Sequence, residues 1–575
     1  MRDVNLIKWY ASAPWKIILL ISIALVVFSG LFNHDVWTPD EPRVAAIVKN
    51  MYLSGNFIIP QFADIPFVEK PPLFFIFAVS LMHLTGLDPV MAGRLGLAVF
   101  CLGSLAVTFR LACLIRNREY AWVSLGVLAT LEGFIVNFHW LRVDAALVFT
   151  SIAAIWAFAE AYLNLKMRYL LLAGALTGLA FLSKGPIAIA ICIAPAWLAL
   201  FMRYVYLRKH ENTYQSPPWK TVALYHFTAL LIMCLVIGAW VYPFYLQASP
   251  ELWHAWFWEN QVGRMTGAST GTLGHNHQGE PFFYVSGIFE YSFPWIIFLA
   301  ISLIISAKKL ITRSHIHWVE AFLFFWFIFA VVILSYSSTK RSMYLAPLTP
   351  LFALLAADVA MKIQGSWVTW YRRLCLTIML LLLAIFAVTP LWVKHLPSDK
   401  IPTALMEWLS TWQMTALWVI LAIALMIKVE ATRWPNWTKL ALITSLFFTA
   451  NFYHLFVAID IAKDMKKDLH TLVQQIPDEK RARTAGIRFT ETMSSIFYLY
   501  EEWPVPLVDK ERAKRILEGK DKDYEYLLID RNNTLQEPLS YIGLSNDIPY
   551  EVLVIGHPRS DKVKDAVFWL KGSVN

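Results

Sequence analysis

The sequence predicts a polytopic α-helical membrane protein with a small soluble α/β domain at its C-terminal end. Of its 575 residues, 58% are hydrophobic and 16% are charged, and the mean hydropathy is +0.51. Apolar runs of membrane-spanning length recur over residues 1–460, whereas charges become frequent and apolar runs short over residues 461–575. This composition excludes an ordinary soluble enzyme. We expect a transmembrane domain over 1–460 and an α/β domain over 461–575.

The first apolar run, residues 16–32, is expected to remain as a membrane helix, because it lacks the small-residue cleavage site of a signal peptide. Arg2, Lys8 and Lys16 stand before it or at its start. Positive charges favour the cytoplasmic side of a membrane. The N-terminus is therefore predicted to be cytoplasmic, and the loop that begins at Trp37 is predicted to lie on the outer side.

Residues 44–53 form an amphipathic pattern with Pro42 in the first turn, so we expect a helix along the membrane surface. Residues 61–70 are expected to return irregularly toward the membrane. The short apolar stretch 73–84 is predicted to be interfacial or re-entrant, because the basic clusters named below then share one side of the membrane.

Further apolar runs are predicted to span the membrane and bring the total to about thirteen helices. They cover residues 92–114, 122–138, 145–163, 170–182, 187–202, 222–245, 288–306, 322–334, 345–360, 374–393, 416–427 and 440–459. Basic clusters at 116–118, 166–168, 203–209, 308–313 and 372–373 then share the cytoplasmic side. An odd number of spans places the C-terminal domain on the outer side.

The formal net charge of +9 does not indicate nucleic-acid binding, because Lys and Arg lie mostly in short loops between apolar runs. The five cysteines all lie within apolar runs and show no CxxC spacing. Neither a disulfide framework nor a zinc site is expected of them.

The first outer loop and its return hold two acids and two cations just outside the bilayer, namely Asp40, Glu41, Arg43 and Lys70. Charges near a membrane are costly, Arg and Lys bind phosphate oxygens, and a carboxylate orients or activates an attacking group. The cluster therefore suits a substrate that carries a phosphate on a lipid tail. The alternative is a juxtamembrane cluster that only fixes topology.

The predicted topology gathers further polar segments on the same outer face. They are residues 142–144, 183–186, 247–286 and 337–344. Lys and Arg placed against the positive-inside bias indicate an active site, although every polytopic protein needs some polar loops.

The outer loop 247–286 also carries His254, Glu259, His275, His277 and Glu280. The types of His275, His277 and Glu280 suit a divalent metal ion of unknown identity. A solvated polar loop is the alternative, because their spacing matches no standard motif. The aromatic residues of this loop are typical of an interfacial belt, or of a lipid groove.

In the C-terminal domain, apolar runs at 485–487, 526–529 and 552–555 predict buried strands, and 494–502 and 509–518 predict helices. The domain shows no glycine-rich phosphate loop. We expect it to serve acceptor handling or stability and to be dispensable for donor binding.

Several segments, in order, resemble the motifs of the bacterial aminoarabinose lipid A transferases, which are GT-C glycosyltransferases of the protein-O-mannosyltransferase superfamily. They are Asp40-Glu41-Pro42-Arg43, Phe67-Val68-Glu69-Lys70-Pro71-Pro72, Arg142-Val143-Asp144, Leu182-Ser183-Lys184-Gly185-Pro186 and Thr339-Lys340-Arg341-Ser342-Met343-Tyr344-Leu345-Ala346-Pro347. The resemblance covers about residues 16–350, and a soluble outer C-terminal domain is also a family feature. Pro42 and Pro72 depart from other members, so fine substrate preference need not carry over.

The resemblance implies a GT-C fold in the bacterial inner membrane, with the C-terminal domain in the periplasm. It implies transfer of a sugar, expected to be an aminosugar, from a polyprenyl phosphate such as undecaprenyl phosphate. The implied acceptor is lipid A or another envelope molecule, and modification of lipid A is linked to polymyxin resistance. Asp40 matches the family's essential acid. Arg43 and Lys70 match the cations that hold the donor phosphate. Lys340, Arg341 and Tyr344 match the late loop near the same site.

The chemistry needs no nucleotide or other cofactor, because the lipid phosphate is itself the leaving group. Negative charge grows on that phosphate as the glycosidic bond breaks, and Arg43 and Lys70 would stabilise it. Asp40 would orient the acceptor, or act as a base toward a hydroxyl acceptor. The other candidates are Glu41 and Asp144 as catalytic acids and Glu69, Lys184 and Arg264 for the sugar or acceptor. The acids also suit the sugar amine or a divalent ion.

Two alternatives stay open. Another GT-C transferase, of the protein O-mannosyltransferase type or specific for another envelope glycan, would show the same motifs. A transporter or flippase for lipid-linked sugars would also carry cations for phosphate, although no internal repeat is visible and the polar motifs lie at helix ends.

Overall fold

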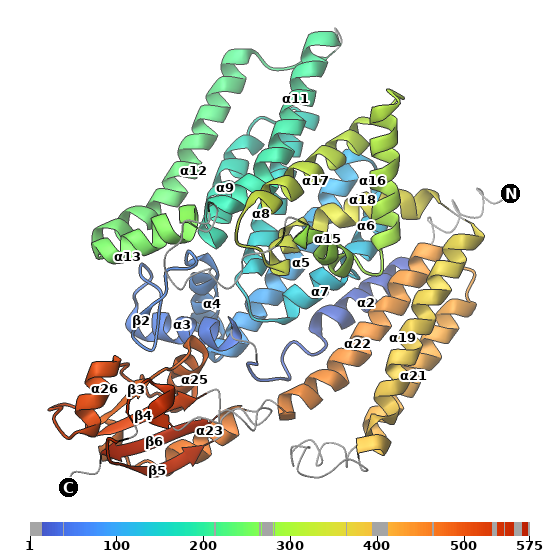
Figure 1. The fold of residues 1–575 in the computed structure, drawn as a ribbon. Helices are drawn as coiled ribbons and strands as arrows, with labels where there is room; N and C mark the ends of the chain where they lie inside the picture. Colours follow the sequence, from blue (N-terminus) through green and yellow to red (C-terminus); the bar gives the residue numbers. More distant parts are fainter. Residues whose placement is uncertain are drawn as a thin grey trace.

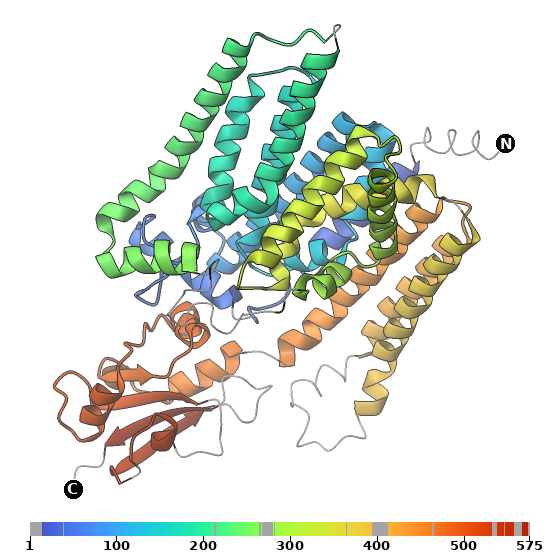
Figure 2. The same cartoon turned by 45° about the horizontal axis from the view of Figure 1, so that its top comes forward.

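The structure is a computed structural model in which a bundle of long helices carries a small mixed sheet at one end (Figure 1). It describes residues 14–37, 40–211, 214–263, 266, 280, 282–363, 365–393, 412–462, 465–531, 538–545, 547–556 and 566–572. Figures 1 and 2 agree that α3 and the sheet lie at the same end of the bundle, with the end of α11 and the start of α12 at the opposite end. We call these ends the α3 end and the opposite end.

The helices of the bundle follow the predicted apolar runs. They are α2 (Pro14–Phe28), α3 (Asp40–Ser54), α4 (Leu73–Thr85), α5 (Pro89–Ile115), α6 (Arg118–Leu128), α7 (Glu132–His139), α8 (Asp144–Leu163), α9 (Tyr169–Lys184), α10 (Pro186–Ala188), the π-helix η1 (Ile189–Ile193), α11 (Ala194–His210), α12 (Trp219–Gln247), α13 (Pro250–His254), the π-helix η2 (Ala255–Gly263), α15 (Phe283–Tyr291), α16 (Ile296–Ile311), α17 (Trp318–Tyr336), the 3₁₀-helix η4 (Ser342–Leu348), α18 (Thr349–Lys362), α19 (Ser366–Val393), α21 (Trp412–Ala431) and α22 (Asn436–Ala462).

Within the described residues, seven helical segments are long and apolar enough to cross a membrane, or eight if the bent pair α6–α7 is one span. The prediction of a polytopic helical membrane protein is confirmed. Local signals set the helix ends as well. Asp88 accepts hydrogen bonds from the N–H groups of Val90 and Met91 at the start of α5, and Gly86, with φ 71°, ends α4 in the left-handed conformation.

Two of the predicted spans are broken, and the sequence prediction of one continuous helix was wrong for each. Residues 122–138 fall into α6 and α7, which meet at a 60° bend. Residues 288–306 fall into α15 and α16, and Pro294 between them lacks the N–H that a continuous helix requires. The two breaks support each other, because Glu132 N donates to the Phe293 carbonyl at 2.9 Å and Trp295 Nε1 donates to Thr130 Oγ1 at 2.9 Å.

The predicted span 187–202 begins with α10 and passes through the π-helix η1 before α11. Pro195 has no N–H to give to the preceding turn, which explains why the hydrogen-bond register widens here. The outer segment after α12, predicted as a long loop, instead begins with the helical stretch α13–η2.

Helix α3 confirms the predicted helix at residues 44–53, and its place along the membrane surface stays a prediction. Its first nine residues, Asp40 to Val48, are all buried, because α3 packs against α4, α5 and α25. The segment after α3, predicted to be irregular, contains a short hairpin of two strands with two residues each, β1 (Gln61–Phe62) and β2 (Ile65–Pro66).

The C-terminal segment forms a four-stranded sheet in the order β3-β4-β6-β5, with β3 and β4 parallel and the other pairs antiparallel. Its elements are α23 (Met465–Gln474), α24 (Asp478–Arg481), β3 (Thr484–Ile487), α25 (Glu491–Glu501), α26 (Lys510–Leu517), β4 (Tyr526–Arg531), α27 (Pro538–Tyr541), β5 (Tyr550–Gly556) and β6 (Ala566–Gly572). Strand β6 has no counterpart among the predicted strands. Helix α25 packs on α3, so the sheet is joined to the bundle at the α3 end.

Candidate active site

Asp40 opens α3 and is surrounded by cations that come from distant parts of the chain. Its Oδ1 lies 2.7 Å from Arg43 Nη2, and its Oδ2 lies 3.2 Å from Arg142 Nε, just before α8. Burial alone would raise the pKa of Asp40, but Lys70, Arg43, Arg142 and Arg341 hold this pKa well below its ordinary value. Asp40 is therefore an anion at neutral pH and a weak base.

Arg43 is enclosed by acids and an aromatic ring. Besides Asp40 it forms an ion pair with Glu491 at the start of α25, and its guanidinium lies 4.9 Å from the centre of the Phe67 ring. Burial opposes the charged form, but Glu491, Glu69 and Asp40 raise the pKa of Arg43. The side chain was predicted to hold the donor phosphate, yet it is absent from the wall of the cavity described below. Its contacts fit the positioning of Asp40.

Glu41 was predicted among the catalytic acids, and the structure shows which groups it contacts. It is completely buried, and its carboxylate accepts the N–H of Trp37 on Oε2 and the N–H of Leu141 on Oε1, both at 3.0 Å. Glu41 thereby ties the first outer loop to the segment that carries Arg142. A carboxylate engaged in this way positions the backbone, and the catalytic role predicted for Glu41 stays a prediction.

A cavity of about 160 Å³, which we call the Lys70 cavity, lies beside Asp40 at the α3 end. Five predicted site residues line it, namely Glu69, Lys70, Lys184, Arg341 and Tyr344. Its apolar wall consists of Leu147, Ile187, Ala190, Ile191, Leu334 and Met343. Cations at one side and aliphatic side chains at the other match a phosphate joined to a hydrocarbon chain.

One cation of this cavity, Lys184, is held by an acid behind it. Lys184, the last residue of α9, forms an ion pair with Asp144 at the start of α8, and its ammonium lies 4.6 Å from the centre of the Tyr344 ring. Burial lowers the pKa of Lys70 below its ordinary value of 10.5, although Asp40 and Asp144 oppose this shift. Asp144 thus neutralises Lys184 from behind, and the catalytic role predicted for Asp144 stays a prediction.

Lys340 and Arg341 were predicted to act together, but they point to different surroundings. Lys340 is buried and donates to the Ser337 carbonyl at 2.8 Å, at the C-terminal end of α17, where a cation offsets the exposed carbonyls. It is not part of the cavity wall, so a role in phosphate binding does not fit its position. Arg341 lines the Lys70 cavity, and no described carboxylate lies within 4 Å of its guanidinium.

Several cavity residues were not predicted from the sequence. Asn260 and Gln261 enter the wall from η2, and Asn260 Nδ2 donates to the Val68 carbonyl at 2.8 Å, which anchors η2 to the segment before Lys70. No motif marks them. Arg142 belongs to a quoted motif but was not among the predicted site residues, although it contacts Asp40 directly.

Three predicted residues, Arg264, His275 and His277, lie outside the described residues, and Glu280 is exposed. Across the described ranges, no three His, Cys, Asp or Glu side chains gather as they would around a metal ion. A divalent metal ion therefore stays a prediction, as does the absence of any other cofactor.

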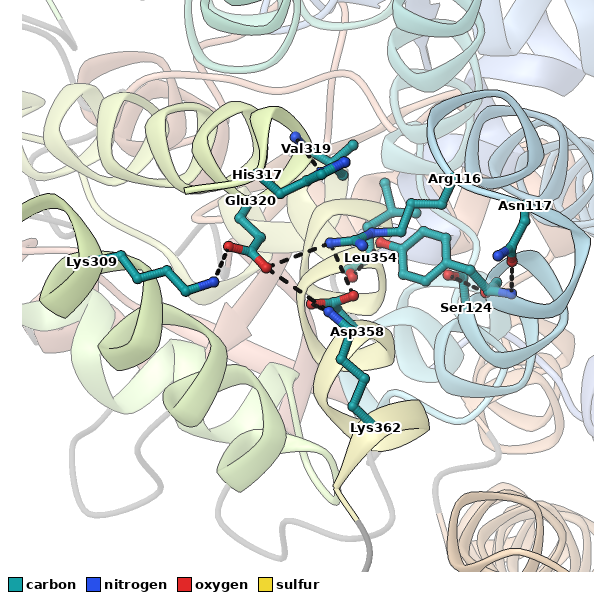
Figure 3. Close-up of polar contacts among 11 residues, drawn as sticks. Arg116, Asn117, Ser124, Lys309, His317, Val319, Glu320, Leu354, Asp358 and Lys362 are labelled. Atoms are coloured by element: carbon teal, nitrogen blue, oxygen red, sulfur yellow. Dashed lines mark hydrogen bonds and ion pairs between the residues drawn. The ribbon is translucent and has the colours of Figure 1, made fainter. Parts of the chain in front are cut away.

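A second charged cluster lies at the opposite end, and Figure 3 shows its ion pairs. Arg116 lies 3.0 Å from Asp358, Lys309 lies 2.6 Å from Glu320, and Lys362 lies 2.9 Å from Asp358. Cations and acids alternate here and satisfy one another, which is typical of a structural network that joins helix ends. A cavity of about 200 Å³ borders this cluster as well, but both cations that line it are paired with acids, Lys309 with Glu320 and Lys362 with Asp358.

Comparison with known proteins agrees with this geometry. A model of the dolichyl-phosphate-mannose-protein mannosyltransferase family matches residues 69–242. The undecaprenyl phosphate-alpha-4-amino-4-deoxy-L-arabinose arabinosyl transferase 2 of Proteus mirabilis (strain HI4320) is 27% identical over 366 residues, which are 62% of this chain and 61% of that protein. The corresponding transferase of Enterobacter sp. (strain 638) is 25% identical over 408 residues, which are 67% of this chain and 68% of that protein. The chain thus spans about three fifths to two thirds of the length of these relatives.

The fold is shared with a solved structure over nearly its whole length. The crystal structure of ArnT from Cupriavidus metallidurans bound to undecaprenyl phosphate superposes with a TM-score of 0.70 and covers 96% of this chain and 98% of its own, at 17% sequence identity. The resemblance drawn from the ordered motifs is confirmed by this fold, by the family match and by the relatives.

Proposed function

Since the chain is an ArnT-like protein with the GT-C fold, we propose that it is an integral-membrane glycosyltransferase. It takes a sugar, an aminosugar by analogy with its relatives, from a polyprenyl-phosphate donor and transfers it to a lipid acceptor such as lipid A. The observation that carries the proposal is the Lys70 cavity, in which Lys70, Lys184 and Arg341 face the same space as an aliphatic wall.

In this proposal the donor phosphate binds the cations of the Lys70 cavity, and the start of its polyprenyl chain lies along Ile187, Ile191 and Leu334. The acceptor attacks the ring carbon that bears the phosphate. The carbon–oxygen bond breaks, and its electron pair leaves with the phosphate as a monoester. Lys70 and Arg341 stabilise the charge that grows on the leaving group.

Asp40 acts as an anion in this scheme and not as a base. Its low pKa makes it a poor proton acceptor, and a phosphate acceptor is already ionised, so no proton needs to be removed. The carboxylate holds Arg43 and Arg142 in place and favours the positive charge that develops on the sugar ring. Glu69 completes the polar side of the cavity and suits hydroxyl or amine groups of the sugar.

We also propose about thirteen spans, with the N-terminus cytoplasmic, the α3 end and the C-terminal α/β domain periplasmic, and the bacterial inner membrane as the location. Basic residues support this orientation, because Arg208 and Lys209 end α11 and Lys308 and Lys309 end α16 at the opposite end. In a cysteine-free variant, a new cysteine at exposed Asp64 should react with an impermeant thiol reagent from the periplasm. A cysteine at Lys209 should not, and the reverse pattern would contradict the orientation.

The test of function is transfer by the purified protein in nanodiscs, supplied with undecaprenyl phosphate carrying aminoarabinose and a lipid A acceptor. The wild-type protein should form glycosylated lipid. Asp40→Asn keeps the shape of the carboxyl group and should abolish transfer while donor binding stays within about threefold, since the cavity cations remain.

Two outcomes would favour another function. Transfer from a mannosyl donor to a peptide, with no aminosugar transfer, would indicate a protein mannosyltransferase, which the family match makes the second candidate. Movement of the donor across the bilayer without product would indicate a transporter. Movement of the donor at the wild-type rate by Asp40→Asn would indicate the same.

A further inference from the structure

A second cavity, of about 250 Å³, is lined in part by Arg142, which contacts Asp40. We call it the Glu132 cavity. It is lined by Glu132, Val136, Trp140, Arg142, Glu290, Tyr291, Arg341, Ser342 and Met343. These residues come from α7, the segment before α8, α15 and the start of η4. The functional motifs predicted from the sequence include neither of its two acids.

The cavity exists because two helices break side by side. The backbone N–H of Glu132 donates to Phe293 across the two breaks, as described above, and Gly133 lets α15 approach α7 closely. A Cβ atom at Gly133 would lie 2.2 Å from the Tyr291 ring. Both α7 and α15 also pack on η4, which brings Arg341 into the wall. Figure 1 shows α7 and α15 next to each other at this level of the bundle.

One side of the Glu132 cavity is cationic and is shared with the proposed donor site. Arg341 and Met343 line both cavities. Arg142 lies 3.2 Å from Asp40 through Nε, and its guanidinium is stacked 4.5 Å from the centre of the Trp140 ring. No described residue accepts a hydrogen bond from the two terminal nitrogens of Arg142, so they are available to an anion.

The other side is acidic. Glu132 and Glu290 lie on α7 and α15, and Oε2 of Glu132 is buried without accepting a hydrogen bond from the described part of the chain. A buried acceptor without a donor is costly, and a ligand hydroxyl or amine would satisfy it. Two carboxylates would repel a second anion. The cavity therefore suits a ligand with one anionic group at the arginines and hydrogen-bond donors at the glutamates, next to the aromatic rings of Trp140 and Tyr291.

The cavity also borders a surface that suits a membrane. On and just before α15, Phe282, Val285 and Phe289 are 82%, 65% and 60% exposed, and they follow one face of the helix. An exposed apolar face on a membrane protein contacts lipid. A ligand anchored by acyl chains could place its head group in the cavity and keep the chains beside α15.

We propose that the Glu132 cavity binds the acceptor, as a lipid-anchored sugar that carries a phosphate monoester. This inference rests on the proposed glycosyl transfer. The phosphate binds Arg142 and Arg341, and the sugar hydroxyls donate to Glu132 and Glu290. Donor and acceptor then meet at Arg341, which lines both cavities. An acceptor phosphate oxygen forms the new bond to the sugar ring carbon as the bond to the donor phosphate breaks, and no proton is transferred.

The test compares the kinetics of two conservative variants with a short-chain acylated glucosamine phosphate as acceptor. Glu132→Gln and Glu290→Gln should raise the KM for this acceptor by roughly five- to tenfold each, the effect of weakening one or two hydrogen bonds to a charged group. The KM for the donor should stay within about twofold, because the Lys70 cavity is intact. Lys184→Ala should show the opposite pattern and raise the KM for the donor.

A matched control is Glu119→Gln, which removes an exposed carboxylate at the opposite end and should leave both KM values unchanged. Glu290 is exposed, so its variant keeps the fold even if Glu132→Gln loses stability. Wild-type acceptor KM in both variants, with transfer intact, would overturn this inference and leave the proposed function standing. A raised KM for the donor in both would also overturn it. Absence of transfer by the wild-type protein would refute the proposed function itself.

Discussion

Lys70 shows how a single side chain links the charge balance of the site to its expected pH dependence. It faces the Lys70 cavity among cations and acids, and burial lowers its pKa below 10.5. An ammonium with a lowered pKa loses its proton at a lower pH than a lysine in the unfolded chain does. Its attraction for phosphate is complete below the folded pKa and is lost as the pH rises through that value.

The first prediction follows from this sign. Between the folded pKa of Lys70 and 10.5, donor affinity should fall as the pH rises, whereas stability should increase, because the unfolded chain binds more protons than the folded protein. Donor binding by fluorescence and unfolding midpoints at a series of pH values above 7 would measure both. Lys70→Met removes the titrating group, so it should flatten both profiles. A donor affinity that rises with pH would contradict the assignment.

Arg341 and Lys340 are adjacent cations for which the structure predicts different effects. Arg341→Ala removes a cavity wall cation and should weaken donor binding by about 1.5 to 3 kcal/mol, the cost of one charge-assisted contact. Lys340→Ala removes the hydrogen bond to Ser337 and should lower the unfolding midpoint while donor affinity stays near the wild-type value. Isothermal titration with the donor and thermal unfolding in detergent separate the two. Equal loss of donor affinity in both variants would restore the role predicted for Lys340 from sequence.

At the scale of secondary structure, the contact between α3 and α25 changes the interpretation of the C-terminal segment. Lys49 on α3 donates to the carbonyls of Tyr498 and Leu499 at 3.2 and 3.0 Å near the end of α25. Glu491 at the start of α25 pairs with Arg43, which also holds Asp40. The segment was expected to be dispensable for donor binding, but these contacts connect it directly to the acid of the candidate site.

Glu491→Gln should therefore reduce turnover more than donor affinity. The change removes one of the two acids that hold Arg43, and the expected cost is roughly 1 to 2 kcal/mol, because the Glu491 side chain is half exposed. A double-mutant cycle with Arg43→Gln should give a coupling energy in kcat, since the two residues share one interaction. Glu479, on α24 and exposed, provides the control as Glu479→Gln. Additive effects of the pair would show that α25 does not act through Arg43.

The sequence predicted most helices well because an apolar run is a local signal. The runs at 145–163 and 222–245 became α8 and α12. The break at Thr130 was missed because it is stabilised by a contact with a distant segment, which has no local pattern. The break at Phe293 did have a local signal, Pro294, which the prediction of one apolar span passed over.

The sequence motifs predicted which charged residues lie near the candidate site. They did not predict what each residue contacts, and therefore did not predict its role. Lys70, Lys184, Arg341 and Tyr344 do line one cavity. Glu41 and Lys340 belong to the same set of motifs, yet both form hydrogen bonds to backbone groups. These hydrogen bonds are visible in the structure and cannot be read from the sequence. Glu132 and Glu290 gained their place from the paired helix breaks, so no sequence motif could point to them.

At the scale of the whole molecule, the two charged clusters divide the bundle into a site at the α3 end and a structural network at the opposite end. Arg116, Lys309 and Lys362 meet Glu320 and Asp358 where α5, α16, α17 and α18 end or begin (Figure 3). Tyr120 adds a hydrogen bond to the Leu354 carbonyl at 2.5 Å. The network joins helices that are far apart in sequence, including α18. Helix α18 directly follows η4, and Arg341 stands immediately before η4.

Glu320 is the acid that the last prediction removes, because it faces three cations. Glu320→Gln leaves Lys309 at 2.6 Å without its acid and weakens the contacts of Arg116 and Lys362 at 3.9 Å. We expect a loss of about 1 to 3 kcal/mol in unfolding free energy, the range for a largely buried charge that loses its partner. Transfer at a permissive temperature should be unchanged, since the Lys70 and Glu132 cavities contain no member of the network.

Lys362→Ala, whose side chain is half exposed, should cost less than about 1 kcal/mol in unfolding free energy and serves as the control. Unfolding in nanodiscs and transfer assays on the same preparations measure both quantities. Loss of transfer by Glu320→Gln at unchanged stability would mean that the opposite end takes part in the reaction.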